Sequence, residues 1–142
     1  MKTLASCTPT EFLKQTNRIR KSVEKWLTDT DIMNIRKRLP HTELAPKDAS
    51  DKEIEAIKVR NDKAAREQMM KNFSAMLDAV LEDHARETIE LLALCCFVEP
   101  EDVDNHPMAE YLEAFNELMN DESVASFFTS LLRWGRTATQ ML

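Results

Sequence analysis

The hydrophobic residues of this chain recur every three or four positions over most of its length, which is the period of an α-helix. Before the first apolar stripe, Thr8 and Glu11 form a capping-box pattern, with Pro9 at the first helical position. The stripe alternates spacings of four and three, at Phe12, Thr16, Ile19, Val23 and Trp26. The pattern predicts a helix over 9–27, followed by a shorter helix over 31–38.

The middle of the chain predicts a linker and then one long helix. Residues 41–49 contain a proline and lack a helical period, so they are the expected linker. Ser50 and Glu53 form a second capping box, and the helical period continues for about thirty residues beyond it. A bend or break is expected near 83–84, since a longer uninterrupted helix would be unusual in a small domain.

The last third of the chain predicts three further helices and an acidic loop. Residues 87–98 are apolar almost all round, and a proline two residues later ends the segment. The acidic loop 99–106 leads into a helix that begins at 107. The residues of this helix that we expect to face inward are Tyr111, Leu112, Phe115, Leu118 and Met119. A last helix is expected over 121–135, because Gly135 is a natural C-terminal stop.

These elements indicate an all-α fold, in the form of a single compact helical domain of five to six helices with one long central helix. Composition agrees, because the 142 residues include one glycine, five prolines and few aromatic residues. The expected parts are a basic N-terminal helical hairpin (1–40), the linker (41–49), a helical core (50–136) and a flexible tail (137–142).

Charge is distributed unevenly along the chain. Residues 1–71 carry a net charge of +5 and residues 72–142 one of −11, within a total of −6. This polarity suggests either that the halves fold on each other or that each faces a different partner. The expected basic surface consists of Lys14, Arg18, Lys21, Lys25, Arg36 and Arg38. These residues lie in two adjacent predicted helices, so a small DNA-binding regulator is the alternative function, although the acidic total disfavours nucleic acid.

The chain is expected to be cytoplasmic and not to associate with membranes. Its N-terminus has no signal pattern, and its longest apolar stretch, Leu91 to Val98, is far short of the ~20 residues that cross a bilayer. Cys7, Cys95 and Cys96 are an odd number of cysteines. We interpret them as thiols of a reducing compartment, with Cys95 or Cys96 in a core.

Catalysis, cofactors and metals are not expected. A single glycine cannot supply a phosphate-cradling loop or a dinucleotide fingerprint. An EF-hand register over Asp102, Asp104 and Glu113 fails, because Pro107 occupies the position that requires glycine. No serine or cysteine is tied by spacing to a histidine base. The sequence therefore predicts a protein that binds other proteins without being an enzyme.

Methionine and aromatic side chains at helical spacing are the candidate contacts for a partner. The flexible methionine side chain can adapt to different partner residues. The short final helix carries a large apolar band, so that one face can pack in the core while another is available to a partner. The predicted partner-binding residues are Met69, Met70, Phe73, Phe127, Phe128, Leu131 and Trp134. Core packing is the alternative interpretation for about half of the methionines.

Three segments of the C-terminal half resemble tail assembly chaperones from prophages of Gram-positive bacteria. They are ETIELLALCCFV at 87–98, HPMAEYLEAF at 106–115 and SFFTSLLRWG at 126–135, and the opening segment 12–39 is similar as well. The resemblance covers most of the chain and includes no catalytic motif. It implies a non-enzymatic, mainly helical protein of the bacterial host cytoplasm that binds the tape-measure protein, helps recruit tail-tube protein and is absent from the mature virion. The apolar stripes would serve either as a groove for this client or for self-association into a homo-oligomer.

Overall fold

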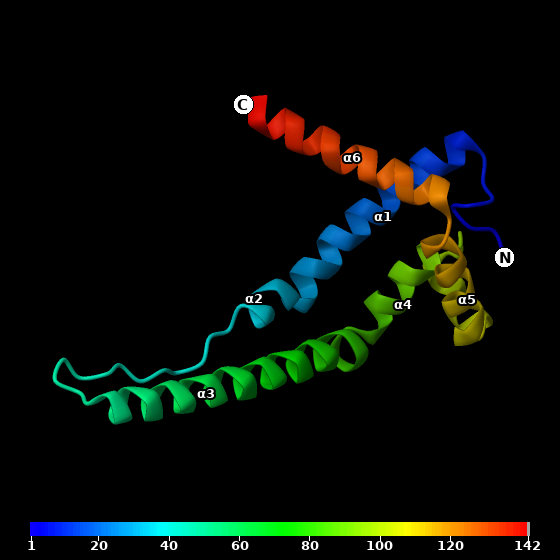
Figure 1. Cartoon of the computed structure of the whole chain (residues 1–142). Coiled ribbons are helices and arrows are strands. Elements are labelled where there is room, and N and C mark those ends of the chain that lie inside the picture. The colour runs from blue at the N-terminus through cyan, green and yellow to red at the C-terminus, as the bar shows by residue number, and fades with distance from the viewer. Residues whose placement is uncertain (142) are drawn as a thin grey trace. The chain divides into compact units, whose positions relative to one another are not determined.

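A computed structural model describes residues 1–141 of the chain, and the side chains of all of these except 139 and 141. The described chain is all-α, as predicted (Figure 1). Its helices are α1 (Pro9–Thr30), α2 (Ile32–Arg36), α3 (Asp51–Asp78), α4 (Ala85–Leu94), α5 (Met108–Met119) and α6 (Glu122–Met141), with a π-helical segment η1 (Ala79–Asp83) and a 3-10 segment η2 (Pro100–Asn105). Two compact units form, one from Met1–Lys25 with the chain from Arg86 onward, the other from Trp26–Ala85.

The predicted capping box at Thr8 and Glu11 is complete, and at Ser50 and Glu53 the N-cap hydrogen bond of the box is present. At the start of α1, the Glu11 backbone N–H donates to the Thr8 hydroxyl over 3.3 Å, and the Thr8 N–H donates to the Glu11 carboxylate over 3.2 Å. At the start of α3, the Ser50 hydroxyl accepts from the Glu53 N–H over 3.2 Å. These side chains satisfy backbone donors that have no partner within the helix, which is why both helices begin where the sequence indicates.

The unit that contains α4, α5 and α6 has two clusters of buried side chains. One is built from Ala93, Cys96, Val98, Val103, Tyr111 and Ala114. The other is built from Leu4, Leu118 and Val124, with Phe12 and Ile19 of α1 packed against it. α1 also contributes Gln15, which is buried and donates through Nε2 to the carbonyl oxygen of Leu94 over 2.6 Å. Phe12 and Ile19 of the apolar stripe thus pack on this unit, and the buried amide of Gln15 has a hydrogen-bond partner.

The C-terminal end of α4 is a left-handed cap. The helix ends at Leu94, so the prediction of a helix to Val98 was too long. Phe97 has a φ of 59°, its N–H donates to the Leu94 carbonyl over 3.3 Å, and the Val98 N–H donates to the Ala93 carbonyl over 3.0 Å. This pair of bonds is the Schellman motif, which reverses the chain without a glycine and buries Val98 against Ala93.

The other unit is built on the long helix α3. The linker 41–49 is non-helical and runs back along this helix (Figure 1). It is held by Asn61, whose amide exchanges two hydrogen bonds with the backbone of Glu43 at 2.9 and 3.0 Å. α3 ends at Asp78 and continues as the π-helical η1, with a turn at His84. The predicted break near 83–84 is therefore confirmed.

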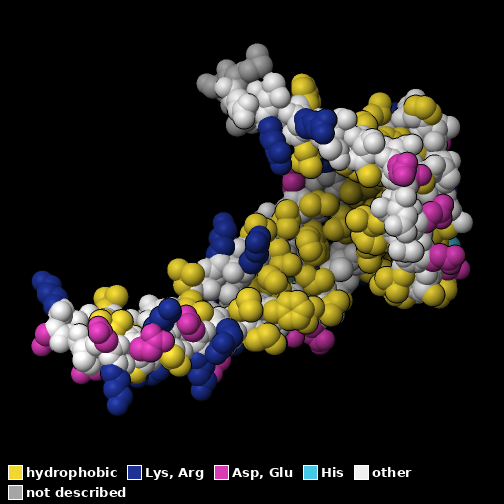
Figure 2. Space-filling view, in the orientation of Figure 1, with side chains coloured by type: hydrophobic (Ala, Val, Ile, Leu, Met, Phe, Trp, Pro, Cys, Tyr) yellow, Lys and Arg dark blue, Asp and Glu magenta, His cyan; other side chains and the backbone are white. Residues whose placement is uncertain are grey.

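Charged and apolar side chains divide along α3. Figure 2 shows Lys, Arg, Asp and Glu crowding its N-terminal part, whereas hydrophobic side chains gather toward its C-terminal part. Most residues of the first half are exposed, in agreement with the mostly polar composition of this stretch.

Helix α6 continues to Met141, so two predictions about the end of the chain were wrong. Gly135 does not stop the helix, and 137–141 are helical; residue 142 lies outside the described residues. Gly135 has no left-handed φ and lies within the helix, with Thr137 hydrogen-bonded to the Arg133 carbonyl over 3.0 Å across it. A glycine acts as a C-terminal cap when it adopts the αL conformation, which Gly135 does not. The residues on either side of Gly135 can form a helix, so α6 continues through it.

Replacing Gly135 by alanine should therefore stabilise the C-terminal part of α6. A Cβ at this position would meet no atom within 4 Å. Alanine is favoured over glycine in a helix by about 1 kcal/mol. Local opening of the helix should therefore be roughly fivefold rarer, and amides that exchange through such openings should exchange roughly fivefold more slowly. Hydrogen exchange over 131–140 measures the effect, and Ala138→Gly is the matched control, with the opposite expected sign. Faster exchange in Gly135→Ala would contradict this account.

Candidate functional site

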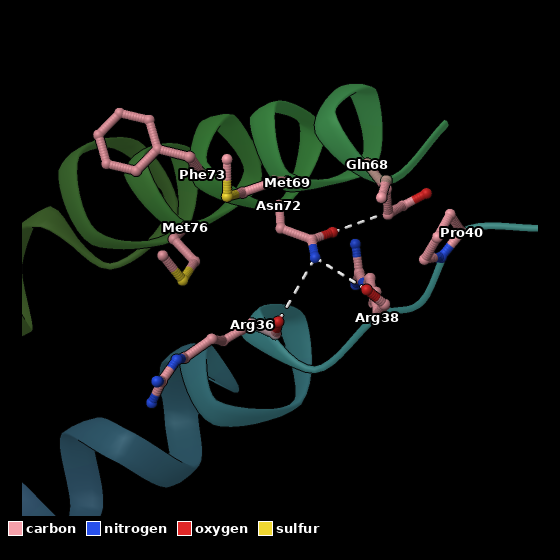
Figure 3. Close-up of a pocket in the computed structure, with 9 residues that line it drawn as sticks. Arg36, Arg38, Pro40, Gln68, Met69, Asn72, Phe73 and Met76 are labelled. Atoms are coloured by element: carbon pink, nitrogen blue, oxygen red, sulfur yellow. Dashed lines mark hydrogen bonds between the residues drawn. The ribbon is translucent and has the colours of Figure 1, made fainter. Parts of the chain in front are cut away.

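The first candidate site is a pocket on α3, which we call the α3 pocket. Its volume is about 380 Å³. It is lined by Arg36, Arg38, Pro40, Ala65, Gln68, Met69, Asn72, Phe73 and Met76. The α3 residues among them recur every three or four positions and form one helix face, about 16 Å long from first to last at 1.5 Å per residue. The two arginines come from the end of α2 and the chain just after it (Figure 3).

Asn72 fixes the wall of the α3 pocket. Its side chain is buried and points from α3 to the end of α2 (Figure 3). Its Nδ2 donates to the backbone carbonyls of Arg36 and Arg38, over 3.4 and 2.9 Å, and its Oδ1 accepts from Gln68 over 2.8 Å. A buried amide with partners for both its ends holds the two arginines beside the apolar residues of α3.

Two neighbouring methionines have the same exposure but different positions. The side chains of Met69 and Met70 are each 64% exposed, yet only Met69 lines the α3 pocket. Phe73, 52% exposed, lies on the same side of the helix as Met69. Of the predicted partner-binding residues of α3, the structure therefore brings Met69 and Phe73 together and leaves Met70 on another face. Sequence reasoning treated the basic and apolar residues as separate sets and missed their convergence here.

The second candidate site is a groove between α1 and α6, the α1–α6 groove. It has a volume of about 430 Å³ and is lined by Thr16, Ile19, Arg20, Val23, Glu24, Phe128, Leu131 and Leu132. Five of these residues are apolar, and the two charged ones, Arg20 and Glu24, pair with each other at 2.7 Å. Figure 1 shows α1 and α6 separating toward the C-terminal end of α6. Two predicted partner-binding residues, Phe128 and Leu131, thus face an open groove.

The remaining predicted residues of α6 differ in their surroundings. Phe127 is half-buried, with its ring edge-on to Phe12 at a centroid distance of 4.9 Å, so it belongs to the packing of α1 on α6. Trp134 is 72% exposed and lines neither the α3 pocket nor the α1–α6 groove.

Helix α5 carries an exposed apolar stripe that the sequence prediction assigned wrongly. Leu112, Phe115 and Met119 were expected to face inward, but they are exposed, as is Met108. These four residues, the α5 stripe, have heptad spacing of four, three and four. The buried face of α5 instead consists of Tyr111, Ala114 and Leu118. The helix has two apolar faces, and the heptad spacing of the second was the signal available in the sequence.

The acidic loop is bound by two arginines of its own unit. Arg18 makes two parallel hydrogen bonds to the Glu99 carboxylate, at 3.0 and 3.1 Å. Arg86 contacts Asp104 at 2.9 Å and the backbone carbonyl of Pro100 at 2.7 Å. Hydrogen bonding from the guanidinium lowers the pKa of Glu99 and raises that of Arg18. Arg18, one of the predicted basic residues of α1, thus pairs with a carboxylate of the acidic C-terminal half of the chain.

The Arg18–Glu99 pair should make stability depend on pH. The pKa of Glu99 is lower in the folded chain, so the pair stabilises it above the unfolded pKa of about 4.5 and loses this effect as pH falls through the folded pKa. Both side chains are about half exposed, so the contribution should not exceed about 1 kcal/mol. Denaturation of wild type and Glu99→Gln between pH 7 and pH 3 tests it. The two stabilities should converge toward low pH, and a constant difference would contradict the assignment.

The other predicted basic residues fall into two places. Lys14, Lys21 and Lys25 are exposed on α1, and Arg36 and Arg38 border the α3 pocket. The structure therefore does not gather the six predicted residues into one element or one pocket.

Among the described residues, no three His, Cys, Asp or Glu side chains are placed to hold a metal ion, and none of the described helices has the length and apolarity to cross a membrane. The three cysteines are free thiols, and Cys96 is buried, as predicted for one of the pair. Burial, with a smaller effect of the neighbouring Cys96, raises the pKa of the Cys95 thiol to about 11. This thiol is therefore protonated at neutral pH and a poor nucleophile.

The described chain is all-helical, with exposed apolar side chains that line a pocket on α3 and a groove between α1 and α6. Comparison of the chain with protein-family models, curated proteins and solved structures gives no match.

Proposed function

We propose that this protein is a non-enzymatic tail assembly chaperone of the Gram-positive prophage type, which binds the tape-measure protein and helps recruit tail-tube protein. The observation that carries the proposal is the α3 pocket, where the exposed side chains of Met69 and Phe73 flank a concave, mostly apolar helix face. Exposing these apolar side chains to water does not stabilise the folded chain, whereas burying them against a partner is favourable. We therefore expect a partner protein to cover them.

A helical client fits this surface. The α3 face of the pocket presents side chains at spacings of three and four over about three turns. A second helix can insert its own ridges into such a face, which is how amphipathic helices bind grooves. A tape-measure protein is a long and partly apolar helix, and covering its apolar face would keep it soluble before the tube forms. Methionine suits a chaperone because its flexible side chain adapts to different client residues.

The proposal expects a tape-measure gene beside the gene for this chain, and co-expression with the tape-measure protein tests it. We expect the wild-type chain to raise the soluble fraction of the tape-measure protein, and the double variant Met69→Ser/Phe73→Ser to lose most of this effect. Met70→Ser/Leu77→Ser is the matched control, because these side chains are also exposed on α3 but do not line the pocket. All four residues are exposed, so both variants should fold.

Equal solubility of the client with and without this protein would refute the chaperone function. The DNA-binding alternative predicts instead that the protein retards a labelled duplex, with an affinity that falls steeply as salt rises. Retardation together with an unaffected client would favour that alternative.

A further inference from the structure

We propose that the α3 pocket selects an acidic client segment: an amphipathic helix whose apolar stripe is flanked by carboxylates, which Arg36 and Arg38 bind. This rests on the proposed function, in which a helix of the client binds at the α3 pocket, and it adds the charge that this helix carries.

The chain around the α3 pocket is basic, although the protein as a whole is acidic. Residues 36–40 and 65–76, which span the lining of the pocket, hold five lysines and arginines and one glutamate, a net charge of +4 within a total of −6. The glutamate, Glu67, lies outside the lining and contacts Lys63 at 4.0 Å. Among the described residues that line the pocket, none is acidic. The pocket therefore has a positive potential that attracts carboxylates.

Both arginines of the pocket are available to a partner. They are exposed, and within the described part of the chain neither forms a salt bridge. The Asn72 hydrogen bonds use the backbone carbonyls of Arg36 and Arg38, so they do not engage either guanidinium group. A guanidinium can bind a carboxylate through two parallel hydrogen bonds, as Arg18 does with Glu99.

The two arginines lie toward different ends of the apolar face of α3. Arg36 extends on the side where Met76 lies, and Arg38 lies on the side of Gln68 (Figure 3). Gln68 and Met76 are eight residues apart on α3, or about 12 Å of helix. A client helix lying along this face would meet an arginine near each end, and its apolar residues would contact the α3 side chains between them.

The apolar part of the lining favours an acidic helix over nucleic acid as the occupant. Five of the nine lining residues are apolar, namely Pro40, Ala65, Met69, Phe73 and Met76. A phosphate backbone would pair with the arginines but leave these side chains in water, whereas the stripe of an amphipathic helix would cover them. The positive charge in turn disfavours a helix flanked by lysines.

Two synthetic helical peptides, titrated against the full chain, test the charge preference. Both carry the same stripe of leucines at spacings of three and four, flanked by glutamates in one peptide and by lysines in the other. We expect the glutamate peptide to bind at least about tenfold more tightly, with an affinity that falls as salt rises. Fluorescence anisotropy measures both affinities.

Charge reversal assigns the preference to the two arginines. Arg36→Glu/Arg38→Glu should weaken binding of the glutamate peptide by at least about tenfold, and Arg36→Lys/Arg38→Lys, which keeps both charges, by no more than about threefold. Lys47→Glu/Lys71→Glu is the matched control, because it makes the same change in net charge at exposed residues outside the lining. Its effect should stay within about twofold at physiological salt. Circular dichroism verifies the helical fold of each variant.

Equal binding of the two peptides, or no binding of the glutamate peptide, would overturn the inference. So would retardation of a labelled duplex that is lost in Arg36→Glu/Arg38→Glu, because the arginines would then bind nucleic acid. Sedimentation of the wild type as an oligomer that Met69→Ser/Phe73→Ser disperses would overturn it as well, because a second copy would then occupy the pocket.

The co-expression experiment tests the chaperone function separately. A client that this protein keeps soluble, together with equal binding of the two peptides, would overturn only the selection of an acidic segment. A client that stays insoluble, together with a clear preference for the glutamate peptide, would overturn only the identity of the client.

Discussion

Replacing Tyr111 by alanine should lower the free energy of unfolding by about 3–5 kcal/mol. Its side chain is 1% exposed and packs with Ala93, Cys96 and Val103, and its hydroxyl donates to the Val103 backbone carbonyl over 2.9 Å. Truncation removes a large buried ring, leaves a cavity and deprives a buried carbonyl of its partner. Chemical denaturation followed by circular dichroism measures the loss.

Two further variants separate the causes of this effect. Tyr111→Phe keeps the ring and should cost about 1–2 kcal/mol, through the unpaired Val103 carbonyl. Leu112→Ala removes an exposed neighbour on the same helix and should change stability by no more than about 0.5 kcal/mol. If Leu112→Ala were as damaging as Tyr111→Ala, the assignment of the buried and exposed faces of α5 would be incorrect.

Replacing Asn72 by aspartate should lower the free energy of unfolding by about 3 kcal/mol. The carboxylate has the shape of the amide but cannot donate, so it would face the carbonyls of Arg36 and Arg38 without a proton between them. Hydrogen exchange over 32–38 should accelerate as well, because the Asn72 amide bonds this turn to α3. Under the proposed chaperone function, the same change should also reduce the binding of the client at the α3 pocket.

Asn116→Asp is the matched control for Asn72→Asp. Asn116 is exposed on α5, so an identical chemical change there should alter stability by no more than about 0.5 kcal/mol. Asn72→Ala should lie between the two, since it removes the hydrogen bonds without burying a charge. Equal stabilities of Asn72→Asp and Asn116→Asp would show that the amide does not clamp the turn.

The starts of the helices could be predicted because their causes are local. A capping box needs only residues three apart, so Thr8 with Glu11 and Ser50 with Glu53 identified two helix starts from sequence alone. The break near 83–84 was predicted from length. The C-terminal ends of the helices were predicted less well, since Gly135 lies inside α6 and α4 ends at Leu94. A C-terminal cap depends on the φ angle of one residue, and tertiary packing decides that angle.

The candidate sites could be predicted only in part. Periodicity identified Met69, Phe73, Phe128 and Leu131 as apolar residues beyond what a core needs, and all four line an open pocket or groove. It could not tell that Met70, with the same exposure as Met69, lies outside the α3 pocket. Which exposed residues share a concave surface depends on the neighbouring element, here the end of α2.

By itself, the sequence determined that this chain is all-helical, where its main helices begin and that its charge is polarised, because propensity, capping and composition act over a few residues. Only the tertiary structure decided which of two apolar faces of α5 is buried. Tyr111, Ala114 and Leu118 fill a core, and the equally apolar α5 stripe is left in water. The physical reason is that hydrophobic burial is non-directional, so a helix with two suitable faces is oriented by the packing of its neighbours.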